Sequence, residues 1–483
     1  MKQIAEQALE AVTRPDVSYA DVRVIEHRDR HVSTKNGKLG TVSANESLGA
    51  GIRVLMAGCW GFAATDDLSP KGIDRAAARA VEIARSSALA RKTAIVLAPE
   101  GRHEAVWVSP CAIDPFSIPV EENLGLLLSI DAELRKNPGV TLAEASMVFA
   151  RERQFFASSA GSRIDQTRTT SGAGFCAHSY KDDEIQQRSY PNSFGGQHQL
   201  KGYEAIADLR LLENAPRVAE EAVALHSAAQ CPEGEFDLIL DSSQLALQIH
   251  ESIGHPIELD RVLGSEANYA GMSFLTLDNL GKLRYGSPIV NVVADARLDH
   301  GPGLGTFAFD DEGVPAQCSP IIRDGLFTGY LMSRETAAAA GCTHSNGAMR
   351  ADGWGRIPLI RMTNVSLLAG EQPIEAVFDG DAVYLETNRS WSIDDHRLNF
   401  QFGCEIGWEI RGGKRTRMLK NPSYSGVTPE FWNSCAAIAD RRHWTLWGTP
   451  NCGKGQPEQV MGTGHGASPA RFKKVKIGSA YGG

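Results

Sequence analysis

The dipeptide Asn36-Gly37 constrains the fold of this chain strongly, because it lies between two segments of strand-forming residues. Residues 31–35 precede it and residues 39–42 follow it. An Asn-Gly pair in this position favours a type I′ turn, which makes the flanking strands antiparallel and fixes their register. Three more segments are expected to extend this hairpin into an antiparallel sheet: residues 19–26, 48–56 and 60–63.

Helical segments flank these strands. Ser69 and Pro70 have the side chains that favour a helix N-cap and first turn, and predict a helix to about Ala90. Asn137-Pro138-Gly139 is expected to end another helix. The remaining predicted helices of this region cover residues 2–12, 119–136 and 202–228, and the strands between them cover residues 140–151, 153–158 and 163–180.

The segment Cys231-Pro232-Glu233-Gly234 is the predicted boundary between two halves. We expect an α+β protein, with an N-terminal α/β half of antiparallel strands and helices at residues 1–230, which could divide into 1–110 and 111–230. Residues 231–483 are expected to form a β-rich, mixed metal-binding domain. Its predicted elements are strands at 236–240, 289–295, 326–332, 382–387 and 402–411, a helix that begins at Ser242 or Ser243, and a helix at about 428–438.

Composition excludes several classes of protein. The formal net charge is −9 and the pI is about 5.9, which argues against nucleic acid as the main partner. No run approaches the ~18 apolar residues of a membrane span. The segment from Met1 to Glu6 resembles the start of an amphipathic helix, without the apolar core of a signal peptide. Nine scattered cysteines fit a reducing compartment, so a cytoplasmic protein is expected.

The hexapeptide from His250 to His255, HESIGH, has the residue types of a zinc site. Two imidazoles suit Zn²⁺, and Glu251 between them can act as a base toward a metal-activated water. The histidines are five residues apart, which is roughly 140° around an ideal α-helix and too far for one ion. A π-like widening or a helix end near Gly254 and Pro256 would bring them together. A chance pair of structural histidines is the alternative.

The segment HESIGHPIELD, from His250 to Asp260, resembles the active-site signature of the TldD/PmbA family, whose members have long been called modulators of DNA gyrase. The resemblance covers nearly the whole chain and favours the catalytic, TldD-like branch. The other matching segments are Lys35-Asn36-Gly37, residues 49–54, Gly305-Thr306, residues 309–313, Asn346-Gly347-Ala348, residues 360–364 and residues 451–454.

The resemblance implies a zinc-dependent peptidase that acts on unfolded or small peptides. It identifies Cys452 as the third zinc ligand beside His250 and His255, and Glu251 as the general base. From the residues alone, Cys404, Cys342 or Glu258 could compete with Cys452. Glu258 and Asp260 are candidates to orient the ligand imidazoles. The group that stabilises the oxyanion is not identifiable, and for the candidates His344, Arg350 and His465 a structural role is the simpler explanation.

The resemblance also implies a homodimer, or a heterodimer with a TldE/PmbA-like partner, and a peptide as substrate. The rival from another class is a non-enzymatic adaptor of the gyrase-modulator type with a structural metal site. The two differ in their need for Glu251, because only a peptidase requires a general base.

Overall fold

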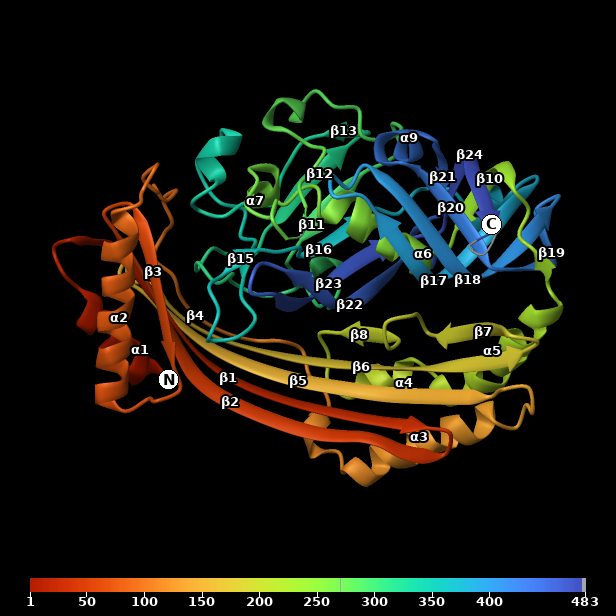
Figure 1. The fold of residues 1–483 in the computed structure, drawn as a ribbon, viewed down its shortest axis with the longest axis horizontal. Coiled ribbons are helices and arrows are strands. Elements are labelled where there is room, and N and C mark those ends of the chain that lie inside the picture. The colour runs from red at the N-terminus through yellow and green to blue at the C-terminus, as the bar shows by residue number, and fades with distance from the viewer. Residues whose placement is uncertain (270, 480–483) are drawn as a thin grey trace.

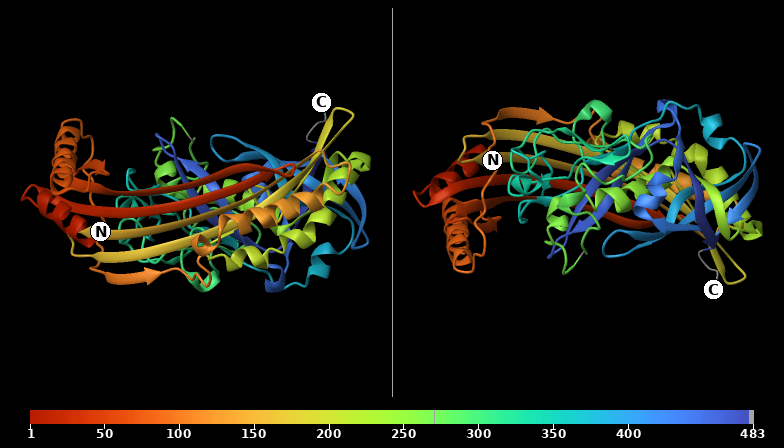
Figure 2. Two further views of the ribbon diagram at one scale, coloured as in Figure 1. Left: turned by 90° about the horizontal axis from the view of Figure 1, so that it is seen from below. Right: turned by 90° about the horizontal axis from the view of Figure 1, so that it is seen from above.

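The computed structural model describes residues 1–269 and 271–479 and shows an α+β protein (Figure 1). A long, curved sheet runs along one side, and a β-rich C-terminal region lies against its concave face (Figures 1 and 2). The expected fold class is confirmed, whereas the division at residues 230 and 231 stays a prediction. No helix among the described residues is long and apolar enough to cross a membrane.

The long sheet grows from the Asn36-Gly37 hairpin. Asn36 and Gly37 have φ of 50° and 73°, the left-handed values that a type I′ turn requires, and Lys35 pairs with Lys38. The strand order is β3-β2-β1-β5-β6-β4, with β7 and β8 also paired to β6. The strands are β1 (Val17–Lys35), β2 (Lys38–Met56), β3 (Cys59–Thr65), β4 (Glu104–Val108), β5 (Leu142–Ser158), β6 (Arg163–Lys181), β7 (Glu184–Tyr190) and β8 (Gln197–Gln199).

Helices cover the ends and the convex face of this sheet (Figure 1). Ser69 caps α2, where its side chain accepts a hydrogen bond from the Gly72 N–H at 3.2 Å, as expected. A core of alanine, valine and isoleucine joins α1 and α2 to the sheet, and a second core joins α3 and α5 to it. The helices are α1 (Lys2–Val12), α2 (Pro70–Ala88), α3 (Val120–Leu134), α4 (Glu204–Asp208) and α5 (Leu211–Ala224).

The C-terminal region contains two larger sheets around an extensive hydrophobic core, and a two-stranded sheet of β14 and β15. One sheet has the order β17-β10-β24-β20-β18-β19-β9, with β21 also on β24, and the other has the order β13-β12-β11-β16-β23-β22. The strands are β9 (Ala229–Gln230), β10 (Gly234–Leu240), β11 (Val292–Asp295), β12 (Cys318–Arg323), β13 (Leu326–Phe327), β14 (Met349–Arg350), β15 (Leu359–Ile360), β16 (Asn364–Leu367), β17 (Ala382–Ile393), β18 (Asn399–Arg411), β19 (Lys414–Lys420), β20 (Pro422–Val427), β21 (Cys435–Ile438), β22 (Thr445–Lys454), β23 (Gln459–Ala467) and β24 (Ala470–Ser479). Its helices are α6 (Ser242–Ile249), α7 (Leu259–Val262), α8 (Ile374–Phe378) and α9 (Thr428–Asn433).

Several predicted boundaries are wrong, each where tertiary contacts override local pattern. The strands expected at 19–26 and 31–35 are one strand, because β1 pairs with both β2 and β5 across its charged middle. The helix expected at 202–228 is interrupted at Arg210, which has φ 48°. The helix expected at 428–438 ends at Asn433, because the next residues pair with β24 as β21.

Buried ion pairs fasten the long sheet to the C-terminal region. Arg53 of β2 contacts Asp21 of β1 at 2.7 Å and Glu312 of the C-terminal region at 3.3 Å, with all three side chains buried. At the opposite end, Arg188 of β7 contacts Glu405 of β18 at 3.2 Å. Burial disfavours each charge alone, so each arginine depends on its carboxylates.

We expect Arg53→Met to destabilise the protein by about 3–5 kcal/mol, because Asp21 and Glu312 would stay buried without a counter-charge. Chemical denaturation measures the change. The matched control is Arg411→Met, which breaks an ion pair with Asp381 whose side chains are 58% and 58% exposed. The control should change stability by less than about 1 kcal/mol. Equal effects of the two substitutions would contradict the buried network.

Candidate metal centre

The motif histidines lie at the end of α6, where the helix changes to π geometry. Residues His250–Gly254 form a π-helical turn, and the His255 N–H donates to the His250 carbonyl at 3.1 Å. This i→i+5 bond adds a residue to the turn and lets side chains five apart project to the same side. The predicted departure from α geometry at this motif is therefore confirmed.

Gly254 permits this turn by its size. Its backbone φ is not in the left-handed region, but an added Cβ would lie 2.2 Å from Met362 Sδ. The turn is also tied from the other side, because Ser252 accepts hydrogen bonds from Tyr285 Oη at its carbonyl and from Trp432 Nε1 at its hydroxyl, the latter at 2.9 Å. Packing on both sides therefore fixes the position of the two histidines.

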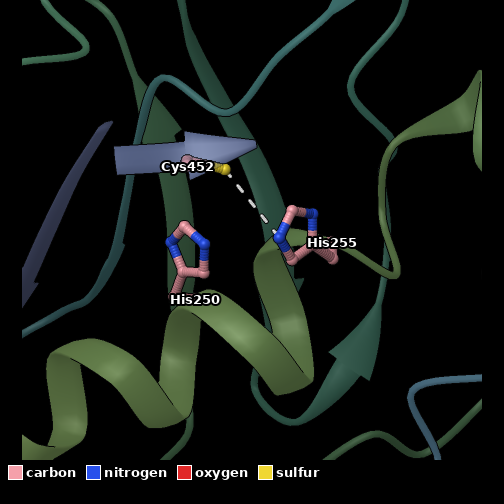
Figure 3. Close-up of side chains that lie close together, drawn as sticks. All are labelled: His250, His255 and Cys452. Carbon is pink, nitrogen blue, oxygen red and sulfur yellow. Dashed lines mark hydrogen bonds between the residues drawn. The ribbon is translucent and has the colours of Figure 1, made fainter. Parts of the chain in front are cut away.

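The π turn and β22 bring together His250, His255 and Cys452 (Figure 3). One donor atom from each lies within 4.8 Å of the others, and all three residues are buried. Cys452 Sγ lies 3.8 Å from His255 Nε2. Among the residues that the structure describes, neither Cys404 nor Cys342 joins this group.

Each imidazole has a partner on its other nitrogen. His255 Nδ1 donates to Glu258 Oε2 at 3.1 Å, so its Nε2 faces Cys452. His250 Nδ1 lies 2.8 Å from Nε2 of His465 on β23. Glu258 thus contacts a motif imidazole, and its orienting role stays a prediction. Asp260 instead accepts a hydrogen bond from Lys454 Nζ at 2.7 Å.

Charges around the three residues favour the forms that bind a metal. Burial lowers the pKa of both His250 and His255, which keeps the imidazoles neutral. Burial raises the pKa of the Cys452 thiol, whereas the positive charge of Arg361 lowers it. Two neutral imidazoles and a thiol near a guanidinium are a suitable donor set for Zn²⁺.

The distances also suit a tetrahedral ion. Neighbouring ligand atoms of a zinc site lie about 3.3–3.8 Å apart, given Zn–N near 2.0–2.1 Å and Zn–S near 2.3 Å. The separation of 3.8 Å between Cys452 Sγ and His255 Nε2 agrees with this spacing. Small side-chain movements would close the remaining gaps, so the residues fit the metal.

Glu251 lies beside the group and is held by an arginine. Arg397 Nη1 donates to Glu251 Oε2 at 2.6 Å. Arg397 belongs to the loop between β17 and β18 and has φ 61°, a conformation that favours glycine. No sequence signal pointed to Arg397, because it lies 146 positions from Glu251.

In the sequence, Lys454 stood out only as part of residues 451–454, a segment that matches the family. It is fully buried, donates to Ile360 O at 2.7 Å and lies 3.5 Å from Glu258 Oε1. Its position two residues after the candidate ligand Cys452 is the sequence signal that could have identified it. Lys454 thereby helps to hold the carboxylate that contacts His255.

The three candidates for oxyanion stabilisation lie in different environments in the structure. His344 is exposed and contacts the Pro99 carbonyl. Arg350 is buried and donates to the carbonyls of Met362, Leu304 and Gly462. His465 is fully buried beside His250. Of the three, only His465 contacts a motif residue.

Comparison with known proteins shows that the candidate metal site lies in a region that matches a known protein domain. Residues 233–479 match the PmbA/TldA metallopeptidase C-terminal domain, residues 20–84 match domain 1, and residues 113–229 match the central domain. The motif and Cys452 both lie within the first match.

Relatives of known name agree with these matches. A metalloprotease of Methanothermobacter thermautotrophicus is 28% identical, over 96% of this chain and 96% of its own length. A zinc metalloprotease TldD homolog of Saccharolobus solfataricus is 27% identical, over 51% of this chain and 52% of its own length.

Solved structures share the fold. A protein of Thermotoga maritima, described as a candidate modulator of a DNA gyrase, superposes with a TM-score of 0.77 at 16% identity, over 99% of each chain. TldE from Thermococcus kodakarensis superposes with a TM-score of 0.73 at 14% identity, over 99% of this chain and 100% of its own.

We expect Gly254→Ala to destabilise the protein by about 1–3 kcal/mol, because the new Cβ displaces Met362 from the π turn. Thermal and chemical denaturation measure this. The double variant Gly254→Ala with Met362→Ala should lose less stability than the two single changes predict together.

The matched control is Gly125→Ala in α3, where an added Cβ meets nothing within 4 Å. Alanine there should be neutral or stabilise the helix by about 1 kcal/mol. Additive effects of Gly254→Ala and Met362→Ala would show that the close contact does not hold the turn.

Proposed function

This chain belongs to the PmbA/TldA metallopeptidase family, and we propose that it is a zinc-dependent peptidase that hydrolyses unfolded or small peptides. The observation that carries the proposal is the convergence of His250, His255 and Cys452 beside Glu251. The name of the Saccharolobus relative supports zinc as the metal. Residues 231–483 are the proposed metallopeptidase domain.

His250, His255 and Cys452 would hold the zinc. Bound there, zinc would supply Lewis acidity that polarises the peptide carbonyl and acidifies the attacking water. Glu251 takes the proton from that water and delivers it to the departing amine. Glu258 holds the His255 ring through Nδ1 and so directs Nε2 toward the metal position.

Arg397 sets the position of Glu251. A charge-assisted hydrogen bond of 2.6 Å restricts the rotamers of the carboxylate and leaves its other oxygen for the water. Both residues are largely shielded, since the side chains of Arg397 and Glu251 are 16% and 7% exposed.

A non-enzymatic adaptor remains the rival function, because the structural relative from Thermotoga maritima is described in terms of DNA gyrase. The buried carboxylate beside the candidate ligands favours the peptidase. Assembly with a second copy or with a TldE-like chain, and location in the cytoplasm, stay predictions.

We expect the purified protein to bind one Zn²⁺ per chain through nitrogen and sulfur. X-ray absorption should show distances of about 2.0–2.1 Å and 2.3 Å. Removal of the metal with a chelator should abolish cleavage of an unstructured fluorogenic peptide, and added Zn²⁺ should restore it. A spectrum with oxygen ligands alone would refute the proposed centre.

Replacing Glu251 by Gln should leave zinc bound and lower peptide cleavage by about 10²–10⁴-fold, because the proton acceptor is lost while the three candidate ligands remain. Cys452→Ala removes a ligand, so metal content and cleavage should fall together. Zinc analysis and turnover are measured on the same samples. Exposed Glu235 provides the matched control, and Glu235→Gln should behave as wild type. Full turnover in Glu251→Gln with zinc present would reject this mechanism.

A further inference from the structure

Among the described residues, only His465 makes a polar contact shorter than 3 Å with Nδ1 of His250. Its Nε2 lies 2.8 Å from His250 Nδ1, while its own Nδ1 lies 3.0 Å from the carbonyl oxygen of Val365. Thr463 Oγ1 lies 3.1 Å from the same Nε2 and 3.5 Å from His250 Nδ1. His465 is fully buried.

The Val365 carbonyl fixes where the proton of His465 lies. A carbonyl oxygen can only accept, so a ring nitrogen 3.0 Å away must carry a hydrogen. None of the contacts of His465 is a carboxylate, and full burial favours the neutral ring. A neutral imidazole has a single N–H, so Nε2 of His465 is an acceptor.

The same reasoning then applies to His250. Because Nε2 of His465 accepts, Nδ1 of His250 must donate to it, and His250 carries its proton on Nδ1. The lone pair of His250 is thereby left on Nε2. The result matches His255, where Glu258 holds the proton on Nδ1 and leaves Nε2 facing Cys452.

We infer that His465 is a positioning residue that fixes the tautomer and the ring orientation of His250, so that Nε2 of His250 is presented to the metal. The relay runs from His250 through His465 to the backbone of β16. The two imidazoles of the centre are therefore held by different means, one by a carboxylate and one by a neutral histidine. This inference rests on the proposed zinc function.

A neutral acceptor differs from a carboxylate in charge. Glu258 is a buried anion balanced by Lys454 and Arg261, whereas His465 adds no charge beside His250. The centre with two imidazoles and one thiolate then keeps a net positive charge when zinc is bound. A second carboxylate in place of His465 would reduce that charge and would also be buried without a cation among its contacts.

The test compares His465→Ala, which removes the acceptor, with His465→Gln, whose amide oxygen can still accept from His250. The zinc dissociation constant is measured by competition with a chromophoric chelator, and the Co²⁺-substituted forms are compared by absorption spectroscopy. We expect about 10–100-fold weaker zinc binding and an altered Co²⁺ spectrum in His465→Ala. His465→Gln should bind zinc within a few-fold of wild type.

The matched control is Thr463→Val, which removes the neighbouring hydroxyl and leaves His465 in place. It should retain the zinc affinity of wild type. Equal zinc affinity in His465→Ala and wild type would overturn the inference, and so would equal losses in His465→Ala and Thr463→Val.

Nitrogen-15 NMR of the histidine rings in the zinc-free wild-type chain gives an answer that does not depend on variant stability or on activity. A proton on Nδ1 of His250 supports the inference, and a proton on Nε2 overturns it. If the wild type binds no zinc, the proposed function fails, yet this NMR result still decides the role of His465.

Discussion

One backbone hydrogen bond, from the N–H of His255 to the carbonyl of His250, determines whether the motif can hold a metal. With α-helical bonding the two rings would diverge, and Cys452 could approach only one of them. A π turn is rare in helices, and here the packing of neighbouring residues stabilises it. Met362 fills the space that a side chain at Gly254 would take, and Tyr285 and Trp432 hold Ser252. The centre is therefore a product of packing as much as of ligand chemistry.

Sequence reasoning succeeded where the determinants are local. The type I′ turn at Asn36-Gly37, the cap at Ser69 and the irregular spacing of the motif each depend on a few neighbouring residues. It failed where contacts are distant. The polar middle of β1 breaks the alternation that marks a strand, and only pairing with β5 makes it one. Similarly, β21 contains helix-forming alanines, but it pairs with β24 and is therefore a strand.

The candidate site shows the same division. His250, Glu251, His255 and Glu258 lie within nine residues and were identified together, because a helix turn gathers neighbours. Arg397 comes from the loop between β17 and β18 and His465 comes from β23, and no spacing rule relates them to the motif. Cys452 was less predictable than the motif residues and more predictable than Arg397. From the residues alone, other cysteines could also have been the third ligand, and only the family resemblance selected Cys452. Of the two residues that hold the histidine rings, Glu258 was predicted from its place in the motif, whereas His465 was named only as a candidate for another role.

The buried ion pairs at the two ends of the long sheet have a mechanical consequence. Arg53 and Arg188 anchor the sheet to the C-terminal region at well-separated points, and each bond would be costly to break. A sheet held at both ends cannot rotate away from the C-terminal region about a hinge. The space between the two layers, which includes a cavity of about 480 Å³ walled partly by the β22–β23 hairpin, therefore has a set height. A fixed height limits the thickness of any molecule that can enter this space, without any moving gate.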